Sequence, residues 1–190
     1  QYPYYQDFDG TEFVEGQSGD LDDGWSNPTG DFHDWWVNAG TTGGTSPSDT
    51  GSTGPSDDFP GGGKYLYVES TNPRQSTFKD SSAYLLSPCF DLTQGLVTNG
   101  LVKFYVNMNT SSLEDTINVD IYDATPTPGQ PFGGFKNDVI PPIVGKQGDR
   151  WISFEFTTYP FRNQVTQLRF RGTPGNATGL SDMALDSFKV

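Results

Sequence analysis

The chain has 190 residues and a formal net charge of −13, with 23 glycines, 14 prolines and a single histidine. Such a composition favours short strands and many turns, and no apolar run approaches the roughly 20 residues that a membrane-spanning helix needs. We therefore expect no membrane insertion, and because the negative charge repels phosphate we expect no nucleic-acid partner. The length fits a single domain, residues 1–190, that can bury a core without disulfides.

The N-terminal third is acidic. Residues 1–63 contain 12 of the 24 acidic side chains and no lysine or arginine. A first strand is predicted around residues 7–9, and residues 16–63 form a long stretch rich in Gly, Ser, Thr and Asp. A loop of that length in a compact domain is usually functional or disordered. The aromatic residues at 32–37 indicate that the loop is attached to the body of the domain.

The remainder of the chain alternates between apolar and polar side chains. Strands are predicted at residues 64–69, 82–87, 101–109, 117–122, 151–156, 165–171 and 183–190, with a Pro- and Gly-rich connection at 123–149. Alternation with a period of two indicates sheets with one buried face. About eight strands of this kind predict an all-β fold, an antiparallel jelly-roll β-sandwich with long acidic loops near its N-terminus.

Cys89 is the only cysteine, so the chain cannot form an internal disulfide. Its apolar neighbours Leu85, Leu86 and Phe90 favour a buried, inert thiol. Pro88 is expected to end the strand that precedes it, because proline cannot donate a hydrogen bond to a neighbouring strand.

The last predicted strand carries a carboxylate on its apolar face. Asp186 alternates in phase with Ala184 and Phe188, while Lys189 points to the opposite face. A buried carboxylate is costly unless it is paired or bound to a metal. A cation is the expected partner of Asp186, and hydrogen bonds from backbone N–H groups are the alternative.

Calcium is the cation that the composition favours. Aspartate accounts for 19 of the 24 acidic residues, and calcium binds carboxylate and carbonyl oxygens, which Asp- and Gly-rich loops supply. One histidine and one cysteine cannot build an ordinary zinc site. The predicted calcium ligands are Asp9, Asp34, Asp58 and Asp186.

Six short segments form an ordered set along nearly the whole chain: residues 7–9, 34–35, 52–58, 63–70, 83–88 and 184–186. In that order they resemble motifs of MAM domains, from a Phe-Glu opening to an Ala-Leu-Asp-Asp ending. The resemblance implies a jelly-roll module of secreted or cell-surface proteins, with a cation bound near the first and last strands by the four aspartates named above. With only one cysteine, the chain is similar to the cysteine-poor modules of secreted bacterial proteins.

Catalysis is not expected. The sequence contains neither Gly-x-Ser-x-Gly nor His-Glu-x-x-His, which are motifs of nucleophilic and zinc-dependent hydrolysis. The chain is at most an accessory domain of a secreted hydrolase. The predicted function is a calcium-stabilised adhesion or recognition module, secreted or at the cell surface, that contacts an extracellular protein or copies of itself.

Two alternatives remain. In the first, the chain is a carbohydrate-binding module that recognises a polysaccharide through exposed aromatic rings, for which the candidates are Trp25, Trp36, Tyr122 and Tyr159. In the second, it is a structural subunit of a surface filament. Asn109 and Asn176 begin Asn-x-Ser/Thr sequons, which accept glycans in secreted eukaryotic proteins.

Overall fold

The computed structural model describes residues 3–19, 21–31, 33–42, 53–68, 81–93, 100–110, 113–175 and 181–190. Parts of the predicted loop and motifs, at residues 43–52 and 69–70, lie outside these ranges, as does Asn176. Within them, no helix is long and apolar enough to cross a membrane. One short 3-10 turn, η2 (Tyr159–Phe161), follows the ninth strand.

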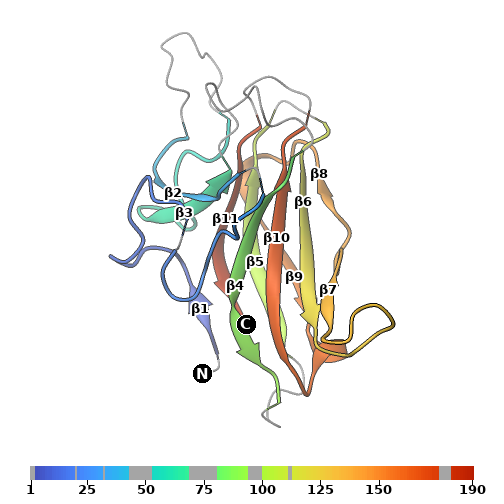
Figure 1. Cartoon of the computed structure of the whole chain (residues 1–190). Helices are drawn as coiled ribbons and strands as arrows, with labels where there is room; N and C mark the ends of the chain where they lie inside the picture. The colour runs from blue at the N-terminus through green and yellow to red at the C-terminus, as the bar shows by residue number, and fades with distance from the viewer. Residues whose placement is uncertain are drawn as a thin grey trace.

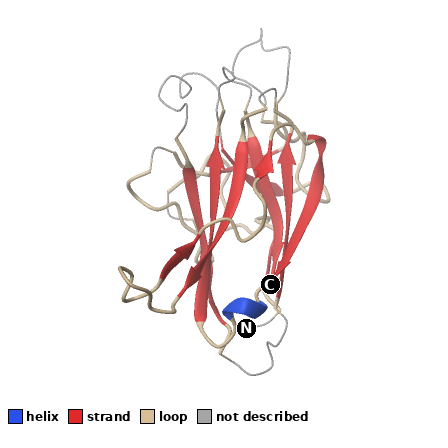
Figure 2. Cartoon of the chain, turned by 90° about the vertical axis from the view of Figure 1, so that its right-hand side faces the viewer, coloured by secondary structure: helices blue, strands red, loops and turns tan. Residues whose placement is uncertain are grey.

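Two antiparallel sheets form the body of the molecule (Figures 1 and 2). The first sheet has the order β2 (Trp36–Ala39), β3 (Lys64–Val68), β11 (Met183–Lys189), β5 (Leu101–Met108) and β9 (Gly148–Thr157), and β1 (Tyr5–Gln6) pairs with β11. The second has the order β4 (Ala83–Asp91), β10 (Val165–Thr173), β6 (Thr116–Asp123) and β7 (Gly134–Lys136), and β8 (Ile143–Val144) pairs with β6. This arrangement confirms the predicted antiparallel β-sandwich.

The core lies between the two sheets and is rich in aromatic rings. Trp25 is 1% exposed, and its ring contacts Phe8, Phe170 and Phe188 at centroid distances of 5.2, 6.2 and 5.1 Å. Its indole N–H donates to the hydroxyl of Tyr4 (3.0 Å). The N-terminal segment therefore packs onto the core through edge-to-face aromatic contacts, which stabilise beyond the area they bury.

The aromatic segment of the acidic loop is attached to the body of the domain, as predicted. Trp35 is fully buried, and its indole N–H donates to the carbonyl oxygen of Ala83 on β4 (3.1 Å). The side chain of Asn27 accepts from the backbone N–H of Trp35 (2.8 Å) and donates to its carbonyl oxygen (3.0 Å). These bonds satisfy backbone groups that the irregular loop would otherwise leave unpaired.

The predictions for Pro88 and Cys89 were wrong. β4 continues past Pro88 to Asp91, and Cys89 is exposed. The pairing register of β10 with β4 shifts between Gln167 and Arg169, so β4 holds one extra residue there. Such a bulge reverses the alternation that follows it and turns Cys89 outward. Proline is tolerated because β4 is the outermost strand of its sheet.

Two further boundaries differ from the expectation. The first strand lies at Tyr5–Gln6 rather than at residues 7–9, because Phe8 adopts a positive φ of 60° and turns the chain out of the sheet. The connection at 123–149 contains the short strands β7 and β8. The sequence did not predict them, because this segment is rich in proline and glycine.

Replacement of Trp25 by alanine should reduce the free energy of unfolding by about 3–5 kcal/mol, because it leaves a large cavity among three aromatic rings. Urea unfolding followed by circular dichroism measures this loss. The matched control is Phe132→Ala, which removes a ring that is 86% exposed and should change stability by less than about 0.5 kcal/mol. Equal effects of the two substitutions would contradict the placement of Trp25 in the core.

Candidate functional site

Asp186 lies on β11, which is the middle strand of its sheet, and its side chain is fully buried. The backbone N–H of Phe59 donates to its Oδ2 (2.7 Å) and that of Ser187 to its Oδ1 (2.5 Å). Ser187 has a positive φ of 48°, and the register of β11 with β5 shifts immediately after Asp186. Met183 and Leu185 belong to the core, so Asp186 lies on the opposite face of β11, toward the loop that contains Phe59. The irregularity that follows it returns Phe188 to the core, and the expectation that Asp186 shares a face with Phe188 was therefore wrong.

The loop at residues 57–63 covers Asp186. Its Asp58 is 4% exposed and accepts a hydrogen bond from the N–H of Gly63 (2.7 Å). The ring of Phe59 stacks on Tyr105 of β5 at a centroid distance of 3.9 Å, and Trp151 of β9 donates its indole N–H to the carbonyl oxygen of Asp57 (3.0 Å). Aromatic contacts from two strands therefore hold this loop over the carboxylate of Asp186.

Asp9 approaches the same loop from the N-terminal segment. Its Oδ1 accepts from the backbone N–H of Lys64 (2.6 Å), while the ammonium group of Lys64 donates to the carbonyl oxygens of Asp9 and Gly10 (2.8 and 2.9 Å). A Cβ atom at position 63 would lie 1.8 Å from Oδ1 of Asp9. Glycine is therefore required at Gly63 for the close approach of Asp9.

The three carboxylates act on one another electrostatically. Burial raises the pKa of Asp186 to about 8, and the negative charges of Asp58 and Asp9 add to the rise, whereas hydrogen bonds from the N–H groups of Phe59 and Ser187 oppose it. Burial also raises the pKa of Asp58, with a further contribution from the charge of Asp9. In the described part of the chain, none of the three forms a salt bridge with a lysine or arginine side chain. We call Asp9, Asp58 and Asp186 the acidic junction.

The chemistry of the acidic junction fits calcium, since carboxylates and loop carbonyls are the oxygen ligands that this ion prefers. The described residues contain no group of three or more His, Cys, Asp or Glu side chains close enough to surround a metal ion. The carboxylates are instead turned toward backbone N–H groups, which was the alternative partner expected for Asp186. Calcium would therefore need carbonyl oxygens to complete its ligand set.

Asp34 lies apart from the acidic junction. The acidic neighbours that raise the pKa of Asp186 are Asp58 and Asp9, whereas the charge of Asp34 acts on Asp31. Asp31 accepts a hydrogen bond from the N–H of Tyr84 on β4 (2.7 Å). Because Trp35 anchors this segment to β4 of the second sheet, the structure does not bring Asp34 to Asp186.

The four aromatic candidates for ligand contact occupy different environments. Trp25 is a core residue, so its ring cannot stack on a sugar. Trp36 is half-buried on β2, opposite Tyr67 of β3. Tyr159 is 47% exposed, and the guanidinium of Arg162 lies 4.0 Å from its ring centroid. Tyr122 lies on β6 beside Phe135 of β7, with ring centroids 5.7 Å apart.

A charge cluster on the outer face of the second sheet was not anticipated. The carboxylate of Asp120 is fully buried by the guanidinium groups of Arg169 and Arg171, each with a nitrogen 2.7 Å from Oδ2. Burial acts to raise the pKa of Asp120, but hydrogen bonds from Arg171, the Asp138 N–H and Arg169 outweigh it, so the pKa is lowered. The sequence places these side chains on outward faces, but only the pairing of β6 with β10 brings them together.

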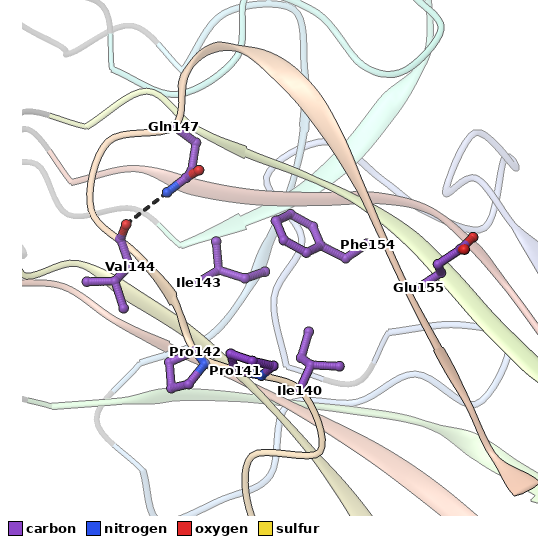
Figure 3. Close-up of a pocket in the computed structure, with 8 residues that line it drawn as sticks. All are labelled: Ile140, Pro141, Pro142, Ile143, Val144, Gln147, Phe154 and Glu155. Carbon is purple, nitrogen blue, oxygen red and sulfur yellow. Dashed lines mark hydrogen bonds between the residues drawn. The ribbon is translucent and has the colours of Figure 1, made fainter.

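A groove of about 500 Å³ opens between β8 and β9 at one edge of the sandwich. Its lining is largely apolar, with Ile140, Ile143 and Phe154, and Figure 3 shows the ring of Phe154 turned toward Ile143 while Glu155 points away. The side-chain amide of Gln147 donates to the carbonyl oxygen of Val144 (2.8 Å) and closes one end. β9 is the outermost strand of its sheet, so the groove runs beside an open strand edge.

The architecture defines a β-sandwich domain with an acidic junction at its central strand and one polar, aromatic outer face. The chain belongs to the MAM domain family (meprin/A5/mu), whose sequence model matches residues 11–190. Family membership confirms the resemblance that the six motifs indicated. The comparison with curated proteins found no match.

Solved structures with a similar fold are distant in sequence. The K1 cleaved adhesin domain of Lys-gingipain from Porphyromonas gingivalis W83 has a TM-score of 0.55 and 16% identity, covering 100% of this chain and 97% of its own. The K2 cleaved adhesin domain of Lys-gingipain has a TM-score of 0.55 and 19% identity, covering 99% and 97%. The C-terminal family 22 carbohydrate-binding module of Clostridium thermocellum Xyn10B has a TM-score of 0.50 and 9% identity, covering 98% and 90%. At these identities the likeness concerns the fold alone.

In buffer with a chelator, the free energy of unfolding should fall as the pH rises from about 5 to about 8. The folded chain retains a proton on Asp186 in this window, whereas the unfolded chain has released it, so the slope is negative and at most about 1.4 kcal/mol per pH unit for this group. The lowered pKa of Asp120 affects stability only at lower pH, outside this window.

Urea unfolding at a series of pH values measures this dependence. The Asp186→Asn variant removes the titrating group and should show a flatter profile than the unmodified chain. An equally steep profile in the variant would contradict the assignment of this pH dependence to Asp186.

Proposed function

We propose that this chain is a non-catalytic recognition and adhesion module of a secreted or cell-surface protein, and that calcium stabilises it at the acidic junction. Membership of the MAM family is the observation that carries the first part of the proposal. The adhesin domains of Lys-gingipain, which have a similar fold, support it. The only histidine, His33, is 8% exposed, which argues against its use as a general base.

The electrostatics of the acidic junction support the calcium part. The junction has two buried carboxylates, Asp58 and Asp186, and one exposed carboxylate, Asp9, whose negative charges repel one another. No described lysine or arginine side chain forms a salt bridge with any of the three carboxylates. A divalent cation would remove this repulsion and replace the proton that Asp186 retains near neutral pH. It would thereby connect the N-terminal segment and the 57–63 loop to the central strand β11.

Adhesion through protein contact has a candidate surface in the groove beside β9. An open strand edge presents unpaired backbone groups to which an extended polypeptide can add as a further strand. The side chains of Ile143 and Phe154 provide an apolar surface next to that edge. Carbohydrate binding is the second candidate function, and the polar, aromatic outer face of the second sheet favours it.

Calcium should raise the melting temperature of the chain, and the shift should increase with free calcium because the ion binds only the folded state. Differential scanning calorimetry of metal-free protein, titrated with calcium and then with EDTA, measures the effect. Asp186→Ala and Asp58→Asn should abolish the dependence on calcium.

Asp34→Asn is the matched control, because Asp34 lies outside the acidic junction. That variant should respond to calcium as the unmodified chain does. A melting temperature that is indifferent to both calcium and EDTA would refute the calcium part of the proposal, while the family assignment would stand.

A further inference from the structure

The outer face of the sheet formed by β4, β10, β6 and β7 combines aromatic rings with planar polar groups. Burial alternates along β10 and β6, so one set of side chains on these strands points away from the core. The main outward-facing residues across the sheet are Tyr84, Asn118, Asp120, Tyr122, Phe135, Gln167, Arg169 and Arg171. We call this surface the outer face.

The cations of the outer face are already neutralised. The carboxylate of Asp120 forms salt bridges with Arg169 and Arg171, and the carboxylate of Asp138 forms a further salt bridge with Arg171 (2.9 Å). Lys136 of β7 lies opposite the core residue Ile121, so it points to the other side of the sheet, where it forms an ion pair with Asp123. An anionic ligand would have to displace one of these carboxylates, and a cationic ligand one of the cations. The charge pattern therefore favours a neutral ligand, even though the chain as a whole carries a charge of −13.

A pocket of about 570 Å³ lies at one end of the outer face, lined by Tyr122, Ala124, Val165, Gln167 and Cys89 among others. This volume is within the range of small-molecule sites, roughly 300–1,000 Å³. The hydroxyl of Tyr122 donates to the carbonyl oxygen of Phe132 (2.5 Å), so the backbone of Phe132 lies beside a residue that lines the pocket. The connection between β6 and β7 that contains Phe132 projects from the sandwich beside the ends of these strands (Figure 1).

Phe132 is 86% exposed and Val165 is 48% exposed. Exposed apolar groups beside a pocket are typical of binding sites, because a ligand that covers them removes apolar surface from water. A pyranose ring presents a flat face of C–H groups that can pack against a ring such as that of Phe132. Its hydroxyls point outward from the edge of the same ring and need hydrogen-bonding partners.

The outer face supplies such partners in fixed positions. The guanidinium of Arg169 lies 4.3 Å from the ring centroid of Phe135 and 5.1 Å from that of Tyr84. Its Nε and Nη2 donate to Asp120 and Asn137, and no described residue accepts from Nη1. The side chain of Gln167 donates to the carbonyl oxygen of Ser87 (2.7 Å), which leaves its Oε1 as an acceptor. Fixed donors and acceptors reduce the entropy cost of binding.

We propose that the outer face binds a neutral polysaccharide, with a sugar ring seated in the pocket against Tyr122 and Phe132 and its hydroxyls meeting Gln167 and Arg169. This inference rests on the proposed recognition function and specifies its ligand class and site. The apolar ring surface, the paired charges and the fixed planar donors all match a ligand that has flat C–H faces, no net charge and many hydroxyls.

The test is a glycan array of neutral, sulfated and uronic-acid oligosaccharides, probed with the calcium-loaded chain. Titration calorimetry with the neutral oligosaccharide that gives the strongest array signal then measures affinity. We expect saturable binding to neutral glycans, weakened at least about tenfold by Phe132→Ala and by Tyr122→Ala through the lost ring contact. Phe132→Ala removes only an exposed ring, so its effect is separable from misfolding.

Tyr159→Ala is the matched control, since Tyr159 is exposed on η2 outside the outer face, and it should bind as the unmodified chain does. Binding confined to charged glycans, no glycan binding at all, or unchanged affinity in Phe132→Ala would overturn the inference. A chain that binds no glycan but contacts a protein partner or itself would refute the inference and leave the recognition function intact.

Discussion

The buried carboxylate of Asp186 is the constraint on which the N-terminal third of the fold depends. It lies on β11, the middle strand of its sheet, where a charge is costly without compensation. The N–H of Phe59 reaches it from the 57–63 loop, and Asp9 approaches the same loop from the N-terminal segment. Hydrogen bonds of Asp186 and Asp9 therefore connect β11, the 57–63 loop and the N-terminal segment, which are far apart in the sequence. A change at Asp186 is expected to loosen the attachment of the loop before it affects the core.

The two sheets have different outer surfaces. The sheet that contains β11 is covered in part by the N-terminal segment and the 57–63 loop, and its acidic groups serve to attach them. On the outer face of the second sheet, the carboxylate of Asp120 forms salt bridges with Arg169 and Arg171 and fixes the positions of both guanidinium groups. Charged groups therefore hold loops in place on one side of the sandwich and organise an aromatic surface on the other. This division separates the elements that stabilise the fold from those that we propose contact a ligand.

Much of the fold follows from local pattern. The alternation in residues 101–109, 117–122, 151–156 and 165–171 predicted the strands that became β5, β6, β9 and β10, because one face of each is turned toward the core, fully buried in β5, β6 and β10 and partly buried in β9. Local pattern failed at Cys89 and Phe8. At Cys89 a bulge against β10 reversed the faces, and at Phe8 a positive φ turned the chain out of the sheet. Both depend on partners that are distant in sequence.

The sequence by itself determined the β-sandwich class and the family, and it predicted one site that contains Asp9, Asp58 and Asp186 together with Asp34. The class can be read from the alternation within single strands, and the family from the order of six motifs along the chain. Only the tertiary structure decided that Asp34 lies elsewhere, that Trp25 belongs to the core, and that Asp120 meets Arg169 and Arg171. These outcomes depend on which strands lie side by side and where a loop is anchored. Strand order arises from the packing of the whole chain, and no local period encodes it.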